Sequence, residues 1–228
     1  MKKLVLFDVD GILVKSKSFG TTSLLMKKHF EIEPLETKVY MEGKTYRWIL
    51  KERLKEAGIK NPEDDARFTN MLEDATLFTD MLKKGKLEKI PHVENLIKKL
   101  LSENITIGLL TGNTKKITEV KLNHVKLNHY FKIGAFGADT NIRFDLVSIA
   151  VKDAKNITGI DFGKKDIFIV GDTIEDIKCA KKNNVKIISV ATGSESYNHL
   201  KSKSPNFLFR DFKNTEKILS VIRNPLCK

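Results

Sequence analysis

Two short acidic motifs hold the residues of this sequence that are best suited to chemistry. Asp8 and Asp10 stand two positions apart before Gly11, and Asp172 stands four positions before Asp176. Carboxylates held close together repel one another, so they need a shared proton or a bound cation. Oxygen ligands favour a hard cation, and Mg²⁺ is the usual one beside a phosphate. If the fold brings the two motifs together, their residue types predict a metal-assisted phosphate site.

A third motif, Thr111-Gly112-Asn113-Thr114, supplies a hydroxyl group and an open backbone. We expect Thr111 and the amides around Gly112 to begin a helix, and a helix start is a natural place for a phosphate. Each motif also has an ordinary structural explanation. Asp10-Gly11 is a common turn, and either the third motif or Asp172 could simply cap a helix. The functional interpretation depends on all three motifs falling at strand ends of one sheet.

Apolar, β-rich runs precede all three motifs, and helical patterns follow them. Nearly continuous apolar strands that alternate with helices predict a parallel sheet covered on both faces. Right-handed crossovers then give a doubly wound α/β fold, whose ligands bind outside the carboxyl ends of the strands. The expected strands are Leu4–Phe7, Ile105–Leu110, Ile167–Val170, Val185–Val190 and Asn206–Phe209, with a short one near Ile133.

A long segment after the first strand departs from this alternation and is predicted to contain helices only. Apolar residues recur at helical spacing around Ser18–Phe30, Thr45–Ala57 and Pro62–Lys84. A single crossover rarely needs so many helices. We therefore predict a helical cap domain over residues 16–88, inserted into an α/β core domain of residues 1–15 and 89–228. The alternative is that these helices pack on the sheet edge within one domain.

Composition narrows the range of partners. The chain has 228 residues, of which 41% are hydrophobic and 31% charged, as in globular proteins. A net charge of +12 is suited to binding nucleic acid or to attracting anionic substrates. The lysines are spread along helix faces and do not form one patch, so we expect no nucleic-acid partner. The only cysteines, Cys179 and Cys227, form no disulfide or zinc pattern. No stretch is apolar enough to span a membrane. We expect a cytoplasmic monomer or homodimer.

The motifs, in this order, resemble those of the haloacid dehalogenase (HAD) superfamily. Residues 7–13, Phe-Asp-Val-Asp-Gly-Ile-Leu, are similar to its DxDGT[LV] signature, residues 110–113 to its second motif, and residues 171–176 to the GDxxxD form of its fourth. The resemblance extends over essentially the whole chain, and the helical insert falls where the C1-type cap falls. It implies a Rossmann-like core and a Mg²⁺-dependent phosphatase of small phosphate esters, similar to phosphoglycolate phosphatase.

Residue roles follow from this resemblance. Asp8 would be the nucleophile that forms an aspartyl-phosphate, and Asp10 would be the general acid that then acts as base. Thr111, with Gly112 and Asn113, would hold the phosphoryl oxygens. The implied Mg²⁺ ligands are Asp8, the backbone carbonyl of Asp10, and Asp172, with Asp176 ordering that shell directly or through water.

The third motif of the superfamily normally supplies a lysine, and here Arg143 is the best match. A guanidinium stays charged and can bridge phosphate and carboxylate. The alternative is that Lys152 or Lys165 takes this role and that Arg143 is an ordinary surface residue. A second departure is Ile12, which stands where the family signature has threonine, and we expect altered packing there.

The cap contains a segment, Glu42-Gly43-Lys44-Thr45 followed by Arg47, that resembles one in phosphoglycolate phosphatase-like proteins. Lys44 or Arg47 would meet a substrate carboxylate or a second phosphate. Equally, Thr45 could cap a helix and Gly43 turn the chain, without any ligand. Two other functions stay open: a sugar-phosphate mutase of the β-phosphoglucomutase type, and a non-catalytic binding protein on the same scaffold.

Overall fold

A six-stranded parallel sheet forms the centre of the computed structural model, which describes residues 2–16, 21–34, 36–38, 41–82 and 87–224. The strand order is β5-β4-β1-β6-β7-β8, so the order reverses at β1 and the predicted doubly wound fold is confirmed. The strands are β1 (Leu4–Phe7), β4 (Thr106–Leu110), β5 (Gly134–Ala135), β6 (Ile167–Gly171), β7 (Lys186–Val190) and β8 (Phe207–Phe209). They agree closely with the predicted runs.

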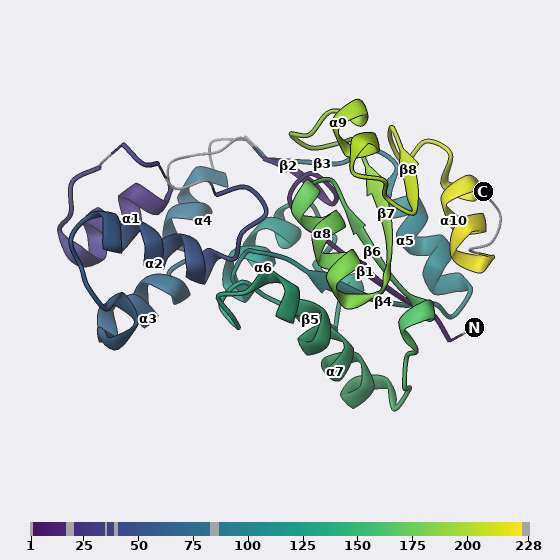
Figure 1. The fold of residues 1–228 in the computed structure, drawn as a ribbon, viewed down its shortest axis with the longest axis horizontal. Helices are drawn as coiled ribbons and strands as arrows, with labels where there is room; N and C mark the ends of the chain where they lie inside the picture. Colours follow the sequence, from purple (N-terminus) through teal and green to yellow (C-terminus); the bar gives the residue numbers. More distant parts are fainter. Residues whose placement is uncertain (1, 17–20, 35, 39–40, 83–86, 225–228) are drawn as a thin grey trace.

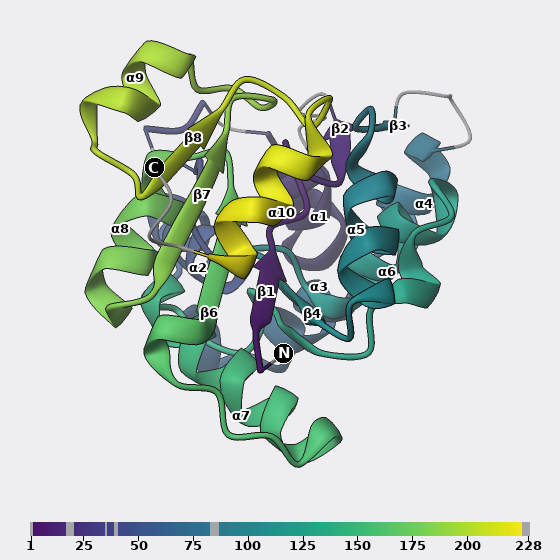
Figure 2. The ribbon, with the colours of Figure 1, turned by 90° about the vertical axis from the view of Figure 1, so that its right-hand side faces the viewer.

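Helices cover both faces of this sheet. Along β1, Val5 and Phe7 enter one apolar cluster while Leu4 and Leu6 enter the other, as the alternation of a strand dictates. The helices α5 (Val93–Ser102) and α10 (Thr215–Arg223) pack on the first face, and α7 (Leu146–Thr158) and α8 (Ile174–Asn183) on the second. Figure 2 shows these two layers on opposite sides of the strands.

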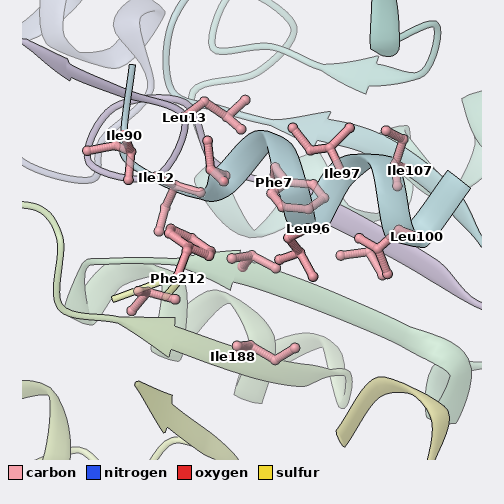
Figure 3. Close-up of a cluster of buried hydrophobic side chains, with 14 of the residues drawn as sticks. Phe7, Ile12, Leu13, Ile90, Leu96, Ile97, Leu100, Ile107, Ile188 and Phe212 are labelled. Carbon is pink, nitrogen blue, oxygen red and sulfur yellow. The ribbon is translucent and has the colours of Figure 1, made fainter. Parts of the chain in front are cut away.

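The first cluster fixes the strand that carries Asp8. Phe7 is fully buried and lies among Leu96, Ile97 and Leu100 of α5 (Figure 3). Burial of an aromatic or aliphatic side chain of this size contributes roughly 1.5–3 kcal/mol. Ile12, the departure from the family signature, is fully buried in the same cluster. The apolar packing therefore holds both sides of the first acidic motif.

The helical insert is present, but it begins and ends in strands that sequence reasoning missed. It contains α1 (Thr21–Phe30), α2 (Tyr46–Glu56), α3 (Ala66–Glu73) and α4 (Thr76–Leu82). The short strands β2 (Val14–Ser16) and β3 (Leu87–Lys89) pair antiparallel, so the chain leaves and returns side by side. The expectation of helices only was wrong, because three-residue strands are too short to show an alternating pattern.

The predicted segment Pro62–Lys84 is also interrupted. Its described part, residues 62–82, contains a 3₁₀ turn (Pro62–Asp64), α3 and α4, and Asp74 between the two helices has extended backbone; residues 83 and 84 lie outside the described residues. Oδ1 of Asp74 accepts a hydrogen bond from the Thr76 amide at 2.9 Å, which stabilises the start of α4. The apolar spacing was therefore read correctly as helical, and the break was missed.

The inserted helices have a hydrophobic cluster of their own. Leu25, Leu50, Phe68 and Met71 are buried in it, together with Ile117 from helix α6 (Lys115–His124). Figure 1 shows α1 to α4 gathered beside the sheet, away from the chain termini. The division into a cap of residues 16–88 and a core of residues 1–15 and 89–228 stays a prediction. None of the helices in the described ranges has the length and apolar character of a membrane span.

Candidate active site

The three motifs meet at the carboxyl ends of β1, β4 and β6, where the strand order reverses. A cavity of about 520 Å³ lies there, between these strand ends and the segment that leads into α2. It is lined by almost all of the predicted site residues, namely Asp8, Asp10, Lys44, Thr111, Gly112, Asn113, Arg143 and Asp172. The position agrees with the rule for ligand sites in open α/β sheets.

Asp8 is held in place by two donors. Its Oδ1 accepts from the Val9 amide at 2.6 Å, and its Oδ2 accepts from Nη2 of Arg143 at 2.7 Å. The same Nη2 also contacts Oδ1 of Asp176. Burial raises the pKa of Asp8 from its ordinary 3.8 to about 6; the charge of Arg143 opposes this shift and that of Asp176 adds to it.

Arg143 therefore lies where the third motif of the haloacid dehalogenase superfamily was expected to supply a cation. It sits in a 3₁₀ turn (Arg143–Asp145) before α7, and it is 6% exposed. Lys152 and Lys165, the alternatives, are exposed and do not line the cavity. The arrangement brings a permanent cation against two carboxylates, so Arg143 is not an ordinary surface residue.

Asp172 lies in a close-fitting cradle of backbone. A Cβ atom at Gly193 would stand 1.7 Å from Asp172 Oδ2, and one at Gly11, whose φ is +77°, would stand 2.3 Å from it. Glycine is needed at Gly11 both for this approach and for the positive φ. Asp172 Oδ1 is buried and has no hydrogen-bond partner. Burial, followed by the charges of Asp176, Asp8 and Asp10, raises the pKa of Asp172 well above its ordinary value.

The donor set fits a hard cation. Asp8, Asp172 and Asp176 each offer a carboxylate oxygen, and these oxygens lie within 4.8 Å of one another. Three buried carboxylates with one oxygen lacking a donor are stabilised by a divalent ion that accepts oxygen ligands. The residues predicted from the sequence as Mg²⁺ ligands are therefore compatible with that ion.

Asp176 has a second task at the start of α8. Its Oδ2 accepts from the Thr173 amide at 3.1 Å and from the Thr173 hydroxyl at 2.7 Å, while its own amide donates back to that hydroxyl at 3.2 Å. This reciprocal capping box fixes the carboxylate relative to the helix. Thr173, not Asp172, caps the helix, so the capping explanation of Asp172 does not hold.

The Thr111 motif differs in one respect from expectation. Thr111 is buried, and its Oγ1 accepts from the Asn113 amide at 3.2 Å and from Asn113 Nδ2 at 3.1 Å. The following helix α6 begins only at Lys115, with Thr114 as its N-cap. Thr111 and Gly112 thus lie in the loop before the helix, not in its first turn, because Thr114 is the residue whose side chain satisfies a free amide, that of Ile117.

Asp10 has a partner that sequence reasoning missed. Lys121 Nζ donates to both carboxylate oxygens of Asp10, at 2.9 and 2.7 Å, and Asn113 Nδ2 donates to Asp10 Oδ2 at 2.6 Å. Lys121 is 6% exposed. The sequence does contain a sign that Lys121 points inward. It follows Ile117, which is buried, by four positions in α6, so helical spacing places both on the same face.

The segment that leads into α2 approaches the site through backbone atoms. The Tyr46 amide donates to the Gly112 carbonyl at 2.6 Å, and the Arg47 amide donates to the Gly137 carbonyl at 2.9 Å. We call these two hydrogen bonds the main-chain latch. Lys44, in the same segment, lines the cavity, and its Nζ lies 3.5 Å from Glu175.

Of the two candidate cap residues, Lys44 and Arg47, the structure places only Lys44 along the cavity. Arg47 does not line the cavity; its Nε donates to Glu63 at 2.8 Å and its Nη1 to the Ala138 carbonyl at 3.3 Å. The ion pair with Glu63 satisfies the guanidinium away from the site. Thr45 does cap α2, with its Oγ1 accepting from the Trp48 amide at 3.4 Å, and Gly43 has a φ of +67°. The structural explanation of this segment thus holds alongside a position for Lys44 in the cavity.

Gly137 leaves no space for a side chain at the latch. A Cβ there would stand 1.7 Å from the Gly112 oxygen and 2.7 Å from the Tyr46 nitrogen. We expect Gly137→Ala to displace the cap segment and lower kcat/KM by up to about 10²-fold, since small misplacements of a site are costly. Gly163→Ala, whose Cβ would find no atom nearer than 3.5 Å, is the matched control. Steady-state kinetics with a small phosphate ester, the substrate class that the family resemblance implies, measure this effect for both folded variants. An unchanged kcat/KM for Gly137→Ala would contradict the prediction.

The fold and the site together define a Rossmann-like α/β enzyme with an acidic centre at the switch point of its sheet. The sequence profile of haloacid dehalogenase-like hydrolases matches residues 5–190. The chain therefore belongs to the haloacid dehalogenase-like hydrolase family, and the prediction of an enzyme of this family is confirmed.

Individual relatives are distant but match over nearly their whole length. Pyrophosphatase PpaX of Oceanobacillus iheyensis is 22% identical over 220 residues, covering 92% of this chain and 94% of that protein. Phosphoglycolate phosphatase of Synechococcus elongatus is 22% identical over 208 residues, covering 90% and 91%. A solved β-phosphoglucomutase from Clostridium difficile has a TM-score of 0.71 at 17% identity over all of both chains. A predicted phosphatase from Clostridium acetobutylicum has a TM-score of 0.64 at 21% identity, covering 96% and 99%.

Proposed function

We propose that this hydrolase is a Mg²⁺-dependent phosphatase of small phosphate monoesters that works through an aspartyl-phosphate on Asp8. The observation that carries the proposal is the convergence of Asp8, Arg143, Asp172 and Asp176 at one buried point, with Asp10 and Thr111 lining the same cavity. Phosphoryl transfer is catalysed mainly by positioning and charge neutralisation. The set of one cation and several carboxylates is suited to both.

The first step would use Asp8 and Asp10 in different roles. A carboxylate oxygen of Asp8 attacks phosphorus and forms an O–P bond, while the bond between phosphorus and the alcohol oxygen breaks. Asp10 gives a proton to the departing alcohol. The Val9 amide donates to one oxygen of Asp8 and Arg143 to the other, so the orientation of the carboxylate group is restrained. Arg143 keeps a positive charge beside the group that becomes phosphorylated.

The second step would release phosphate. A water molecule attacks phosphorus and gives its proton to Asp10, and the bond from phosphorus to the Asp8 oxygen breaks. Thr111, the Gly112 amide and Asn113 would hold the phosphoryl oxygens during both steps. Mg²⁺ bound by Asp8, the Asp10 carbonyl, Asp172 and Asp176 would neutralise the charge that otherwise keeps an anionic nucleophile from an anionic substrate.

Substrate selection would fall to the cap of residues 16–88. Lys44 lines the cavity from the cap side, so it is the residue of this segment that we propose meets a substrate carboxylate or second phosphate. Two of the curated relatives are named phosphoglycolate phosphatase, and a third is named a pyrophosphatase. These names support a small substrate with two acidic groups.

Phosphate release from p-nitrophenyl phosphate and from phosphoglycolate tests the proposal. We expect turnover with Mg²⁺ and a fall to background with excess EDTA, because the buried carboxylates then lack a counter-ion. Mg²⁺ added back should restore the rate, which separates metal removal from unfolding. Absence of Mg²⁺-dependent release from these esters and from a broader ester panel would reject the phosphatase.

A further inference from the structure

We propose that Lys121 is a positioning residue that holds the Asp10 carboxylate in the orientation required for hydrolysis of the phosphoenzyme. The inference rests on the proposed function, since it assigns a supporting role in the second step of that reaction. It concerns a residue outside the four sequence motifs, on the second turn of α6.

The contacts of Lys121 form a closed ring with Asp10 and Asn113. Lys121 Nζ donates to both oxygens of Asp10 and, at 3.1 Å, to Asn113 Oδ1. Asn113 Nδ2 completes the ring by donating to Asp10 Oδ2. Hydrogen bonds between charged groups are the stronger kind. With an ammonium bridging its two oxygens and an amide on one of them, the Asp10 side chain is restrained about both of its torsions.

Burial separates the supporting residue from the reacting one. The Lys121 side chain is 8% exposed, whereas that of Asp10 is 39% exposed. Asp10 lines the cavity and Lys121 does not. Lys121 thus stands behind Asp10 and touches no substrate position, which is the geometry of a residue that acts through another. A buried ammonium is costly unless it is paired, so packing alone gives no reason for a lysine on this face of α6.

The cap covers the same lysine. The ring centre of Phe78, in α4, lies 5.6 Å from Lys121 Nζ. An aromatic face at that distance attracts the ammonium and excludes water from it. The hydrogen-bonded group of Lys121, Asp10 and Asn113 is therefore also contacted by an aromatic side chain of the inserted helices.

The two chemical steps depend differently on Asp10. An alkyl phosphate needs a proton from Asp10 to release its alcohol, but p-nitrophenolate is a stable anion that departs without one. Attack of water in the second step needs Asp10 as the proton acceptor for either ester. Loss of Asp10 orientation should consequently spare phosphorylation by p-nitrophenyl phosphate and slow dephosphorylation.

Rapid-mixing kinetics with p-nitrophenyl phosphate and Mg²⁺ tests this on the full chain. For Lys121→Met we expect a burst of about one p-nitrophenolate per active site at a rate close to that of wild type, then a steady state slower by about 10²-fold or more. Acid quenching should trap phosphoenzyme in the steady state. Lys121→Arg, which keeps a cation, should recover part of the loss, and Lys115→Met, an exposed lysine of the same helix, should behave as wild type.

Several outcomes would overturn the assignment. An unchanged steady state, or an equal slowing of the burst and the steady state, would show that Lys121 does not act through Asp10 in the second step. If Lys121→Met melts below the assay temperature, Lys121→Gln is measured with the same two expectations. Failure of wild type to form any phosphoenzyme would instead count against the proposed function, so the two failures are distinguishable.

Discussion

Asp8→Asn is expected to abolish phosphate release, with a fall in kcat of at least about 10⁴-fold, as for loss of other covalent nucleophiles. Asparagine preserves the shape of the side chain, and its oxygen can still accept from the Val9 amide or from Arg143. The carboxamide cannot form the O–P bond, so no phosphoenzyme should form. Phosphate release and intact-protein mass after acid quenching measure the two effects.

The control for this substitution is Asp161→Asn. Asp161 pairs with Lys155 at the surface, where its side chain is 80% exposed. It should show wild-type kinetics. Residual turnover of Asp8→Asn above about 1% of wild type, with no mass shift in either protein, would point to direct attack by water and would remove the covalent mechanism.

Arg143→Met is expected to lower the free energy of unfolding by about 3–5 kcal/mol, the usual cost of breaking a buried ion pair from one side. Asp8 and Asp176, which both contact Nη2, would become buried charges without a cation. Activity should be lost as well, because the cation beside the transferred phosphoryl group is gone. Urea unfolding and phosphate release measure the two consequences.

Two further variants sharpen the Arg143 experiment. Arg143→Lys keeps the charge but loses the guanidinium fork, so it should be more stable and more active than Arg143→Met and less so than wild type. Arg67→Met breaks an exposed pair with Asp65 and should leave stability almost unchanged. Wild-type stability for Arg143→Met would mean that the two carboxylates do not depend on this cation.

The sheet and most of the acidic centre could be predicted because their signals are local. A buried strand such as Leu4–Phe7 is a continuous apolar run, and its end places Asp8 without further information. Arg143 could be found by its position before a helix, and the structure places it against Asp8. These residues could be identified from the ends of the predicted strands and from the order of the motifs, so few long-range contacts had to be inferred.

The errors have a common physical cause, which is competition between partners distant in sequence. Lys44 or Arg47 was expected at the substrate, and the sequence could not separate them, because the Arg47 guanidinium pairs with Glu63, sixteen positions later. The hairpin of β2 and β3 joins residues on either side of the insert, and neither strand is recognisable alone. Lys121 meets Asp10 across the fold, and only its place on a buried helix face hinted at this contact.

The main-chain latch bears on how such a protein can diversify. Its donors and acceptors are backbone atoms of Tyr46, Arg47, Gly112 and Gly137, so they persist whatever side chains the cap carries at positions 46 and 47. If the insert selects the substrate, as we propose, substitutions in its helices can change that preference without removing these hydrogen bonds. The other side of the main-chain latch tolerates no such change. Glycine is required at Gly137, because any added carbon collides with the Gly112 oxygen.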